Sequence, residues 1–329
     1  MDTIVLSHAL YQPGMDALEG QANIIVTNNG NGKEILKQLK LADAFILRIG
    51  KIDRNVIEAC PNLKVIARPG VGVDSVDVRA ATEHGIPVVI CPAVNFHAVA
   101  EHTIALIFAL SKNLLESDSE TRKGNFGVRS RYSAIELSGR TLTILGFGHI
   151  GREVARLASA VGMKICIFDP FVTKEAADGL QYIFASDLEQ AISSGDFVSV
   201  HMPSLSSTRG MFGEKQFRAM KKSAYFINCA RGDIVNEAEM VRALTEHVIA
   251  GAGIDVLKDE PMKADHPLMK LPNVIITPHM AAQTQETTKK TVLMAAEGTL
   301  SILRGEKWKN VCNPEVYEHP RWRKEGQIW

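Results

Sequence analysis

The stretch Thr141-Leu-Thr-Ile-Leu-Gly-Phe-Gly-His-Ile-Gly151 decides the fold of this chain. Its first five residues predict a buried strand, and the residues that follow Gly151 are typical of a helix. A second apolar run, 164–168, then ends on Asp169. This order of strand, glycine turn, helix, strand and acid is that of a dinucleotide-binding βαβ unit.

Each glycine of the turn has its own physical task. Gly146 permits a tight turn, Gly148 lets the backbone approach a pyrophosphate, and Gly151 lets the helix pack on the strand. The phosphates then lie at the helix N-terminus, where free N–H groups favour negative charge. Asp169 comes 18 residues after Gly151, near the spacing of an acid that binds ribose hydroxyls. Because a carboxylate there repels a 2′-phosphate, we predict NAD rather than NADP.

Composition bounds the remaining possibilities. The 329 residues suffice for two domains, and 37 basic residues balance 37 acidic ones, so no global charge favours nucleic acid or a membrane. The five cysteines are scattered without Cys-x-x-Cys spacing, which favours a reducing compartment, here the cytoplasm, and argues against a metal site. No signal peptide is visible at the N-terminus, and the apolar stretch 103–110 is too short to span a bilayer.

Strand-like runs alternate with helical patterns in two successive series, which predicts two α/β domains, each a doubly wound, Rossmann-like parallel sheet. The expected strands are residues 3–6, 23–26, 44–47, 64–67 and 87–90, then 141–145, 164–168, 181–184, 197–200, 223–227, 250–255 and 273–276.

Two long helical patterns, 100–113 and 284–303, connect the series in place of a flexible linker. The simplest arrangement is therefore an NAD-binding domain, 103–283, inserted into a split substrate domain formed by 1–102 and 284–329. The active site is then expected in the cleft between the domains, beyond the carboxyl ends of the strands.

Polar side chains follow several of these strand ends. Arg231 can grip a carboxylate through two parallel hydrogen bonds, and His279 can exchange a proton near neutral pH. A carboxylate such as Glu260 can orient that imidazole and stabilise its charged form. Each residue also has a plain alternative, namely a surface ion pair, a loop histidine or a solvated charge. Their shared sheet edge favours a catalytic set.

Ordered motifs along most of the chain support a more specific interpretation. They are Arg68 to Asp74, Asn95 to His102, Gly146 to Gly151, Asp169-Pro170, Asn228 to Asp233, Gly253 to Pro261, and Pro278-His279. With these motifs the sequence resembles the D-2-hydroxyacid dehydrogenase family. It is most similar to members that act on 3-phosphoglycerate or reduce hydroxypyruvate and glyoxylate, without the regulatory C-terminal domain of many 3-phosphoglycerate dehydrogenases.

The resemblance implies roles for the matching positions. Arg231 would bind the substrate carboxylate and keto oxygen, Glu260 would raise the proton affinity of His279, and His279 would be the acid–base group. The backbone at Val71 and Gly72 would receive the substrate carboxylate. Contacts to NAD are implied for Gly146, Gly148, His149, Ile150, Gly151, Asp169, Met202, Cys229, Ala230, Arg231, Asp255, His279, Ala281 and Ala282, with Asp255 at the nicotinamide carboxamide.

Departures from the family pattern leave the catalytic set complete. Ala281 and Ala282 replace glycines that usually follow the catalytic histidine, and Ala98 stands where many members have serine. Glu260 replaces the glutamine of the formate dehydrogenase branch, which argues against formate as substrate.

Substrate identity and assembly stay open at this point. Arg48 and Lys51, or Arg129 and Arg131, could bind a second anionic group of a phosphate, sulfonate or carboxylate substrate such as 3-phosphoglycerate or sulfolactate, or could be solvated surface charges. The family implies a homodimer through the NAD-binding domain. The alternative function is an NAD-sensing, corepressor-like binding protein of the same fold.

Overall fold

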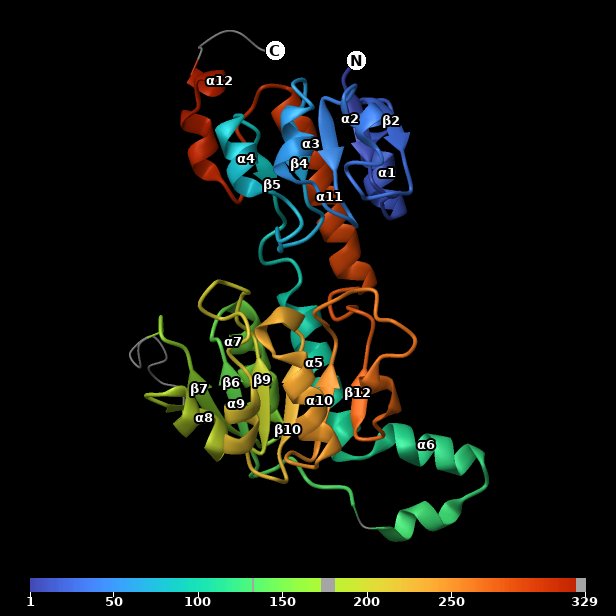
Figure 1. The fold of residues 1–329 in the computed structure, drawn as a ribbon, viewed down its shortest axis with the longest axis vertical. Helices are drawn as coiled ribbons and strands as arrows, with labels where there is room; N and C mark the ends of the chain where they lie inside the picture. Colours follow the sequence, from blue (N-terminus) through green and yellow to red (C-terminus); the bar gives the residue numbers. More distant parts are fainter. Residues whose placement is uncertain (132, 173–180, 324–329) are drawn as a thin grey trace. The chain divides into compact units, whose positions relative to one another are not determined.

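The computed structural model describes residues 1–131, 133–172 and 181–323, which form two compact units. Unit 1 contains Met1–Asn95 and Thr284–Trp329, and unit 2 contains Phe96–Gln283. Unit 1 therefore combines the two ends of the chain, drawn in blue and red in Figure 1. The units divide at residue 95, before the first connecting helix, whereas the sequence placed the boundary within it at residue 102.

Unit 1 is a five-stranded parallel sheet with the order β2-β1-β3-β4-β5. All five strands overlap the runs expected from the sequence. They are β1 (Thr3–Leu6), β2 (Asn23–Val26), β3 (Ala44–Ile46), β4 (Val65–Ala67) and β5 (Val88–Val89), and the helices are α1 (Gln12–Leu18), α2 (Leu36–Leu39), α3 (Arg54–Glu58), α4 (Val78–Glu83), α11 (Gln285–Leu303) and α12 (Pro320–Arg323).

The C-terminal segment completes unit 1. Helix α11 packs against α1 and one face of the sheet, where Val292 and Ile302 are buried among strand residues (Figure 1). Beyond it, the buried Asn313 side chain accepts a hydrogen bond from the Val88 N–H and donates to the Ile86 carbonyl. The tail is thus fixed to the edge strand β5 by paired polar groups, as a buried amide requires.

Unit 2 is a seven-stranded parallel sheet with the order β12-β11-β10-β9-β6-β7-β8. Helices α5 and α7 cover one face, while α8, α9 and α10 cover the other, which is the doubly wound arrangement. The strands are β6 (Thr141–Leu145), β7 (Lys164–Phe168), β8 (Ile183–Phe184), β9 (Phe197–Val200), β10 (Tyr225–Asn228), β11 (Gly251–Ile254) and β12 (Val274–Ile276), and the helices are α5 (Phe96–Ser111), α6 (Leu114–Arg122), α7 (His149–Ala160), α8 (Leu188–Ser194), α9 (Glu214–Ala219) and α10 (Glu237–Thr245).

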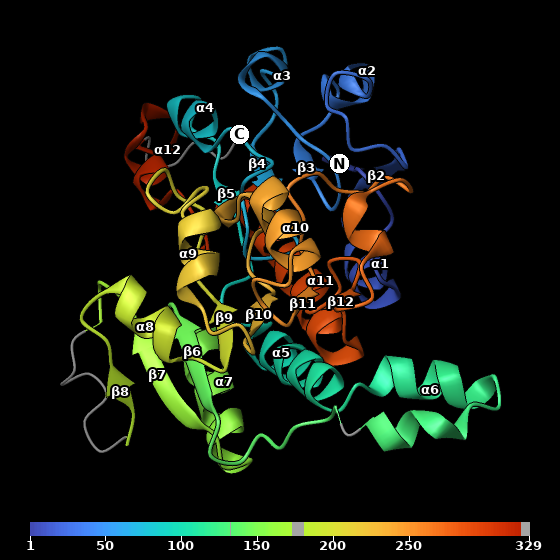
Figure 2. The ribbon, with the colours of Figure 1, turned by 60° about the horizontal axis from the view of Figure 1, so that its bottom comes forward.

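Helix α6 forms an arm that the sequence did not predict. Asn113 adopts a left-handed conformation with φ of 49°, which ends α5 and redirects the chain by 58° into α6. No residue of α6 is buried, and the arm returns through a 3₁₀ helix at Phe126–Arg131 (Figure 2). Within the described ranges, no single helix has the length and apolar character to cross a membrane; α5 and α6 meet that test only as a bent pair.

Candidate active site

Three adjacent strands of unit 2 bring the predicted catalytic residues to one edge. Asn228 of β10 pairs with Ile254 of β11, which pairs with Ile276 of β12, so these strands end in register. Arg231 follows the first strand and His279 the third. Because parallel strands share their carboxyl edge, residues far apart in sequence meet there.

Glu260 and His279 form the central pair of this edge. The Glu260 Oε2 lies 2.7 Å from Nδ1 of His279, and the two side chains are 36% and 52% exposed in unit 2. The hydrogen bond to Glu260 outweighs burial and raises the pKa of His279. Burial raises the pKa of Glu260, but the hydrogen bonds from His279 and from the Leu257 N–H outweigh it, so that this pKa is lowered.

Asp255 holds the turn that carries His279. Its backbone carbonyl accepts from the His279 N–H at 2.8 Å, and its buried carboxylate accepts from the N–H groups of Met280 and Ala281 at 2.9 Å each. His279 has a φ of 51°, in the left-handed region that residues other than glycine adopt uncommonly, although Asn, Asp and His do so more often than most. Three consecutive N–H bonds to one residue keep the backbone in this unfavourable conformation.

Arg231 lies on an extended segment that the Asn228 side chain braces. The Asn228 amide accepts from the Ala230 N–H at 3.0 Å and donates to the Arg231 carbonyl at 2.9 Å. The Arg231 guanidinium donates to the Ala230 carbonyl at 2.7 Å, and its charge helps to lower the pKa of Glu260 and opposes the rise at His279. Cys229, which lies between Asn228 and Ala230 in the sequence, is buried. Burial raises the pKa of its thiol to about 12, so this thiol stays protonated.

The glycine turn follows β6, next to β9, where the strand order reverses direction. A Cβ on Gly151 would overlap the carbonyl oxygen of Gly146, and a Cβ on Gly146, whose φ is 98°, would lie 2.9 Å from the backbone of His201. Gly148 caps α7, and a Cβ there would meet no other part of the protein within 4 Å. Packing within the protein therefore explains why Gly146 and Gly151 lack a side chain, but it does not explain Gly148.

Asp169 is fixed beside this turn. One carboxylate oxygen accepts from the Phe147 N–H at 2.7 Å and the other from the Phe171 N–H at 2.8 Å. The acid at the end of β7 is thereby held against the first residue after Gly146.

The other predicted cofactor contacts stand around the same edge. His149 is the first residue of α7, with its ring 6.0 Å from that of Phe96, and Met202 follows β9. Ala281 is buried with the α5–α7 core, against which Ile150 and Ala282 also pack. Their contacts to NAD remain predictions.

The predicted substrate residues of unit 1 lie on loops beyond its strands. The Arg48 guanidinium donates to the Ala9 carbonyl at 3.1 Å, Val71 is 43% exposed, and the Gly72 carbonyl accepts from Nε of Arg68 at 3.3 Å. Their roles in substrate binding remain predictions. In unit 2, Arg131 pairs with Glu116 of the α6 arm.

Three polar residues at the edge were given no role by the sequence analysis. Thr277 Oγ1 lies 2.6 Å from Asp255 Oδ1 and 3.0 Å from Nε2 of His102. His201 follows β9, with its Nε2 2.8 Å from the Ser199 hydroxyl, and burial lowers its pKa to about 3. A polar residue directly after a strand was the available signal for Thr277 and His201, whereas His102 lies in a helix and carries no such signal.

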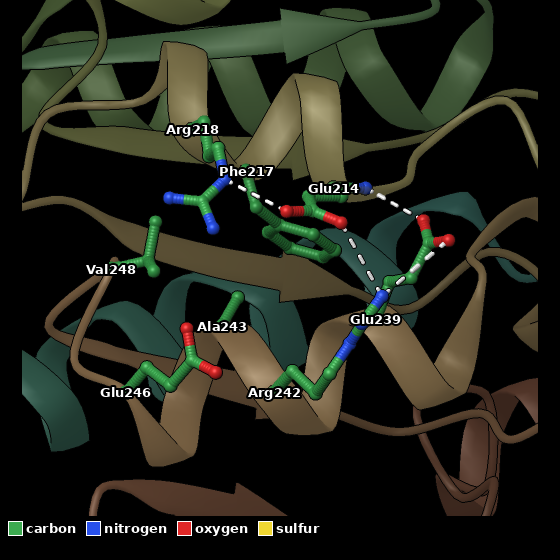
Figure 3. A pocket seen from close by; sticks show the side chains of 8 residues that line it. All are labelled: Glu214, Phe217, Arg218, Glu239, Arg242, Ala243, Glu246 and Val248. Atoms are coloured by element: carbon green, nitrogen blue, oxygen red, sulfur yellow. Dashed lines mark hydrogen bonds and ion pairs between the residues drawn. The ribbon is translucent and has the colours of Figure 1, made fainter.

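A pocket of about 80 Å³ lies away from these residues, between α9 and α10 (Figure 3). Charged side chains line it and pair with one another: Arg218 with Glu214 at 2.9 Å, and Arg242 with Glu214 at 3.4 Å and with Glu239 at 3.8 Å. Of these three ion pairs, the one between Arg242 and Glu214 joins α10 to α9, and the other two lie within a single helix. In the part of the chain that the structure describes, no group of three or more His, Cys, Asp or Glu side chains could hold a metal ion.

Known proteins resemble both the sequence and the fold. The D-3-phosphoglycerate dehydrogenase of Methanocaldococcus jannaschii is 39% identical over 95% of this chain, which spans only 60% of that relative. The chain spans about half of two Arabidopsis thaliana chloroplastic D-3-phosphoglycerate dehydrogenases, at 49% and 52% of their lengths. The glyoxylate reductase of Korarchaeum cryptofilum is 38% identical, with 86% of each chain covered.

Among solved structures, a protein from Thermus thermophilus has a TM-score of 0.87 at 33% identity, with 94% of this chain and 99% of that one covered. An NADPH-dependent glyoxylate/hydroxypyruvate reductase from Sinorhizobium meliloti has a TM-score of 0.84 at 25% identity, with 95% and 97% covered. Residues 104–281 match the NAD binding domain of the D-isomer specific 2-hydroxyacid dehydrogenases. This match takes in the glycine turn, Arg231, Glu260 and His279, and the chain belongs to the D-isomer specific 2-hydroxyacid dehydrogenase family.

Proposed function

We propose that this protein is an NAD-dependent dehydrogenase that interconverts a small D-2-hydroxy acid and its 2-keto acid. The observation that carries the proposal is the Glu260–His279 pair, 2.7 Å apart, at the same sheet edge as Arg231 and the glycine turn. A proton donor, a carboxylate-binding cation and a dinucleotide turn are the groups that this reaction requires.

The geometry assigns the proton positions on His279. An ionised Glu260 accepts from Nδ1–H in both protonation states of the ring, so the titrating position is Nε2. In reduction of a ketone, Nε2–H donates to the keto oxygen. In oxidation, the neutral Nε2 accepts the hydroxyl proton. The raised pKa of His279 favours the protonated form of the ring.

Arg231 is the proposed partner of the substrate carboxylate. Its planar fork can hold both carboxylate oxygens, which fixes C2 relative to His279. The extended backbone at Arg231, braced by Asn228, sets the direction from which the guanidinium acts.

The residues of unit 2 fit NAD. The N-terminus of α7 and the unobstructed Gly148 suit a pyrophosphate, and Asp169 suits unphosphorylated ribose hydroxyls. Among the described residues, Asp255 Oδ2 accepts one hydrogen bond, from the Ala281 N–H, and so can accept another from the nicotinamide carboxamide. Bound NAD supplies the hydride acceptor for C2 of the hydroxy acid.

The substrate and the assembly belong to the same proposal. Relatives named for 3-phosphoglycerate and for glyoxylate support a small 2-keto acid such as glyoxylate, hydroxypyruvate, phosphohydroxypyruvate or sulfopyruvate.

Leu114, Leu115 and Phe126 are 51%, 58% and 68% exposed on the arm, which supports a homodimer through unit 2. All five cysteines are free thiols, which supports a reducing compartment such as the cytoplasm.

An NADH absorbance assay with these four keto acids tests the proposal. We expect turnover of at least one of them, its loss in His279→Ala, and retention of NADH binding in that variant. Turnover by His279→Ala within a factor of two of the wild type would contradict the proton-transfer role. Binding of NADH without turnover of any keto acid would instead favour the NAD-sensing alternative.

A further inference from the structure

A buried chain of hydrogen bonds runs behind the catalytic turn. His102 Nε2 lies 3.0 Å from Thr277 Oγ1, and Thr277 Oγ1 lies 2.6 Å from Asp255 Oδ1. The Asp255 carboxylate is almost fully buried and the His102 side chain is 19% exposed in unit 2. None of these contacts involves the atoms assigned above to proton transfer.

The direction of each bond follows from the number of available protons. A threonine hydroxyl has one proton, and an ionised carboxylate has none. Thr277 therefore donates to Asp255, and its bond with His102 requires a proton on Nε2 of the imidazole. The hydrogen bonds are therefore all donated in one direction, from His102 to Thr277 and from Thr277 to Asp255.

This chain completes the set of donors around Asp255. Oδ1 accepts from the Thr277 hydroxyl and the Met280 N–H, while Oδ2 accepts from the Ala281 N–H. The threonine hydroxyl thereby adds a side-chain donor to the two backbone donors that hold the carboxylate plane. Rotation of that plane would loosen the turn at His279 and turn Oδ2 away from an incoming donor.

We propose that His102 is a positioning residue, which acts through Thr277 to orient the Asp255 carboxylate toward the nicotinamide carboxamide and the turn of His279. This inference rests on the proposed function, because it uses NAD as the cofactor. It adds a residue of helix α5 and a threonine that directly follows β12 to the proposed site.

The test compares two cofactors that differ in one group. NADH carries a carboxamide with N–H donors, whereas reduced 3-acetylpyridine adenine dinucleotide carries an acetyl group without them. We expect Thr277→Val to raise the Kd for NADH about tenfold, but the Kd for the analogue by less than twofold. Thr277→Ser keeps the hydroxyl and should restore the Kd for NADH to within twofold of the wild type.

The two donors should act as one unit. We expect His102→Leu also to raise the Kd for NADH. The double variant His102→Leu/Thr277→Val should have a Kd for NADH no higher than that of the weaker-binding single variant. Thr299→Val removes another buried hydroxyl, which bonds to the Ala295 carbonyl within α11, and serves as the matched control with unchanged Kd.

Equal losses for NADH and for the analogue, or an unchanged Kd for NADH in Thr277→Val, would overturn the inference. These Kd values need no keto acid, so they separate the inference from the reaction. A wild type that binds NADH but reduces no keto acid contradicts only the proposed function. An active wild type whose Thr277→Val variant binds NADH normally contradicts only the inference, and a wild type that does not bind NADH contradicts both.

Discussion

Nδ1 of His279 is bound to Glu260 while the backbone N–H of the same histidine is bound to the carbonyl of Asp255. The ring is therefore oriented by one acid and the backbone by another. This division separates two effects that mutation can measure independently, namely the proton affinity of the imidazole and the position of its turn.

Replacement of Glu260 by glutamine addresses proton affinity. Because Glu260 raises the pKa of His279, we expect Glu260→Gln to lower that pKa. The reduction needs the protonated ring, so the pH at which kcat/KM for reduction falls should move toward acid. The loss at the optimum should not exceed the ~10²- to 10⁴-fold that acid–base catalysis supplies. A pH profile with an unmoved alkaline limb would contradict the pairing.

Replacement of Arg231 by lysine tests the carboxylate clamp. Lysine keeps the charge but loses the planar pair of donors, so we expect kcat/KM for the keto acid to fall by about 10²-fold. NADH binding should change little. Arg209→Lys is the matched control, because Arg209 pairs with Asp233 on the neighbouring loop and should keep activity within twofold. Equal effects of both variants would argue against a specific clamp.

Alanine at two glycines of the turn should give opposite results. Gly151→Ala places a methyl group against the Gly146 carbonyl, and we expect a loss of about 1–3 kcal/mol in the free energy of unfolding. Gly148→Ala meets no other protein atoms, so its stability should stay near that of the wild type while its Kd for NADH rises about tenfold. Denaturant unfolding and NADH titration measure the two quantities. Normal NADH binding by Gly148→Ala would place the pyrophosphate elsewhere.

Removal of the Asp169 carboxylate should change cofactor choice. Asp169→Ala loses the repulsion of a 2′-phosphate, so the ratio of kcat/KM for NADH to that for NADPH should fall by at least about tenfold. NADH binding should also weaken, because the acid holds the Phe147 N–H beside the turn. The ratio is therefore the decisive measurement, and an unchanged ratio would remove Asp169 from cofactor selection.

The burial of His201 should lower the free energy of unfolding at acid pH. Burial lowers its pKa to about 3, below the ordinary value of 6.5, so the unfolded chain binds more protons between these pH values. Stability should therefore rise with pH across this window, by up to about 1.4 kcal/mol per pH unit from this one group. His201→Gln should flatten the slope when urea unfolding is measured between pH 4.5 and 7.5. A slope that the substitution leaves unchanged would contradict the buried neutral state.

The sequence alone predicted the strands well, because apolar runs in parallel sheets are continuous and bounded by polar residues. The run 141–145 and strand β6 coincide, and 250–255 overlaps β11. The sequence did not predict the α6 arm, because the start of the arm depends on one residue. Asn113 adopts a left-handed backbone conformation just before α6, and no apolar periodicity marks the helix that follows it.

The site could be predicted only in part, for a physical reason. Arg231, Glu260 and His279 follow strands that the pattern identifies, so their common edge could be expected. The His102–Thr277–Asp255 chain joins a helix to two strand ends across 175 residues, and no local pattern encodes such a contact. The positive φ of His279 likewise accompanies a bond from its N–H to the carbonyl of Asp255, 24 residues earlier, which no local pattern indicates.

The division of unit 1 into two chain segments has a consequence for synthesis. Residues 1–95 leave the ribosome without α11, which later packs against Ile46, Val65 and Ala67 of their sheet. At roughly 5–20 residues per second, translation of residues 96–283 leaves that apolar face without its helix for about ten to forty seconds. Unit 2, which is continuous, can complete its core in the meantime. The earlier segment of unit 1 thus waits for the later one before its core is complete, and its apolar face stays open to chaperones during that time.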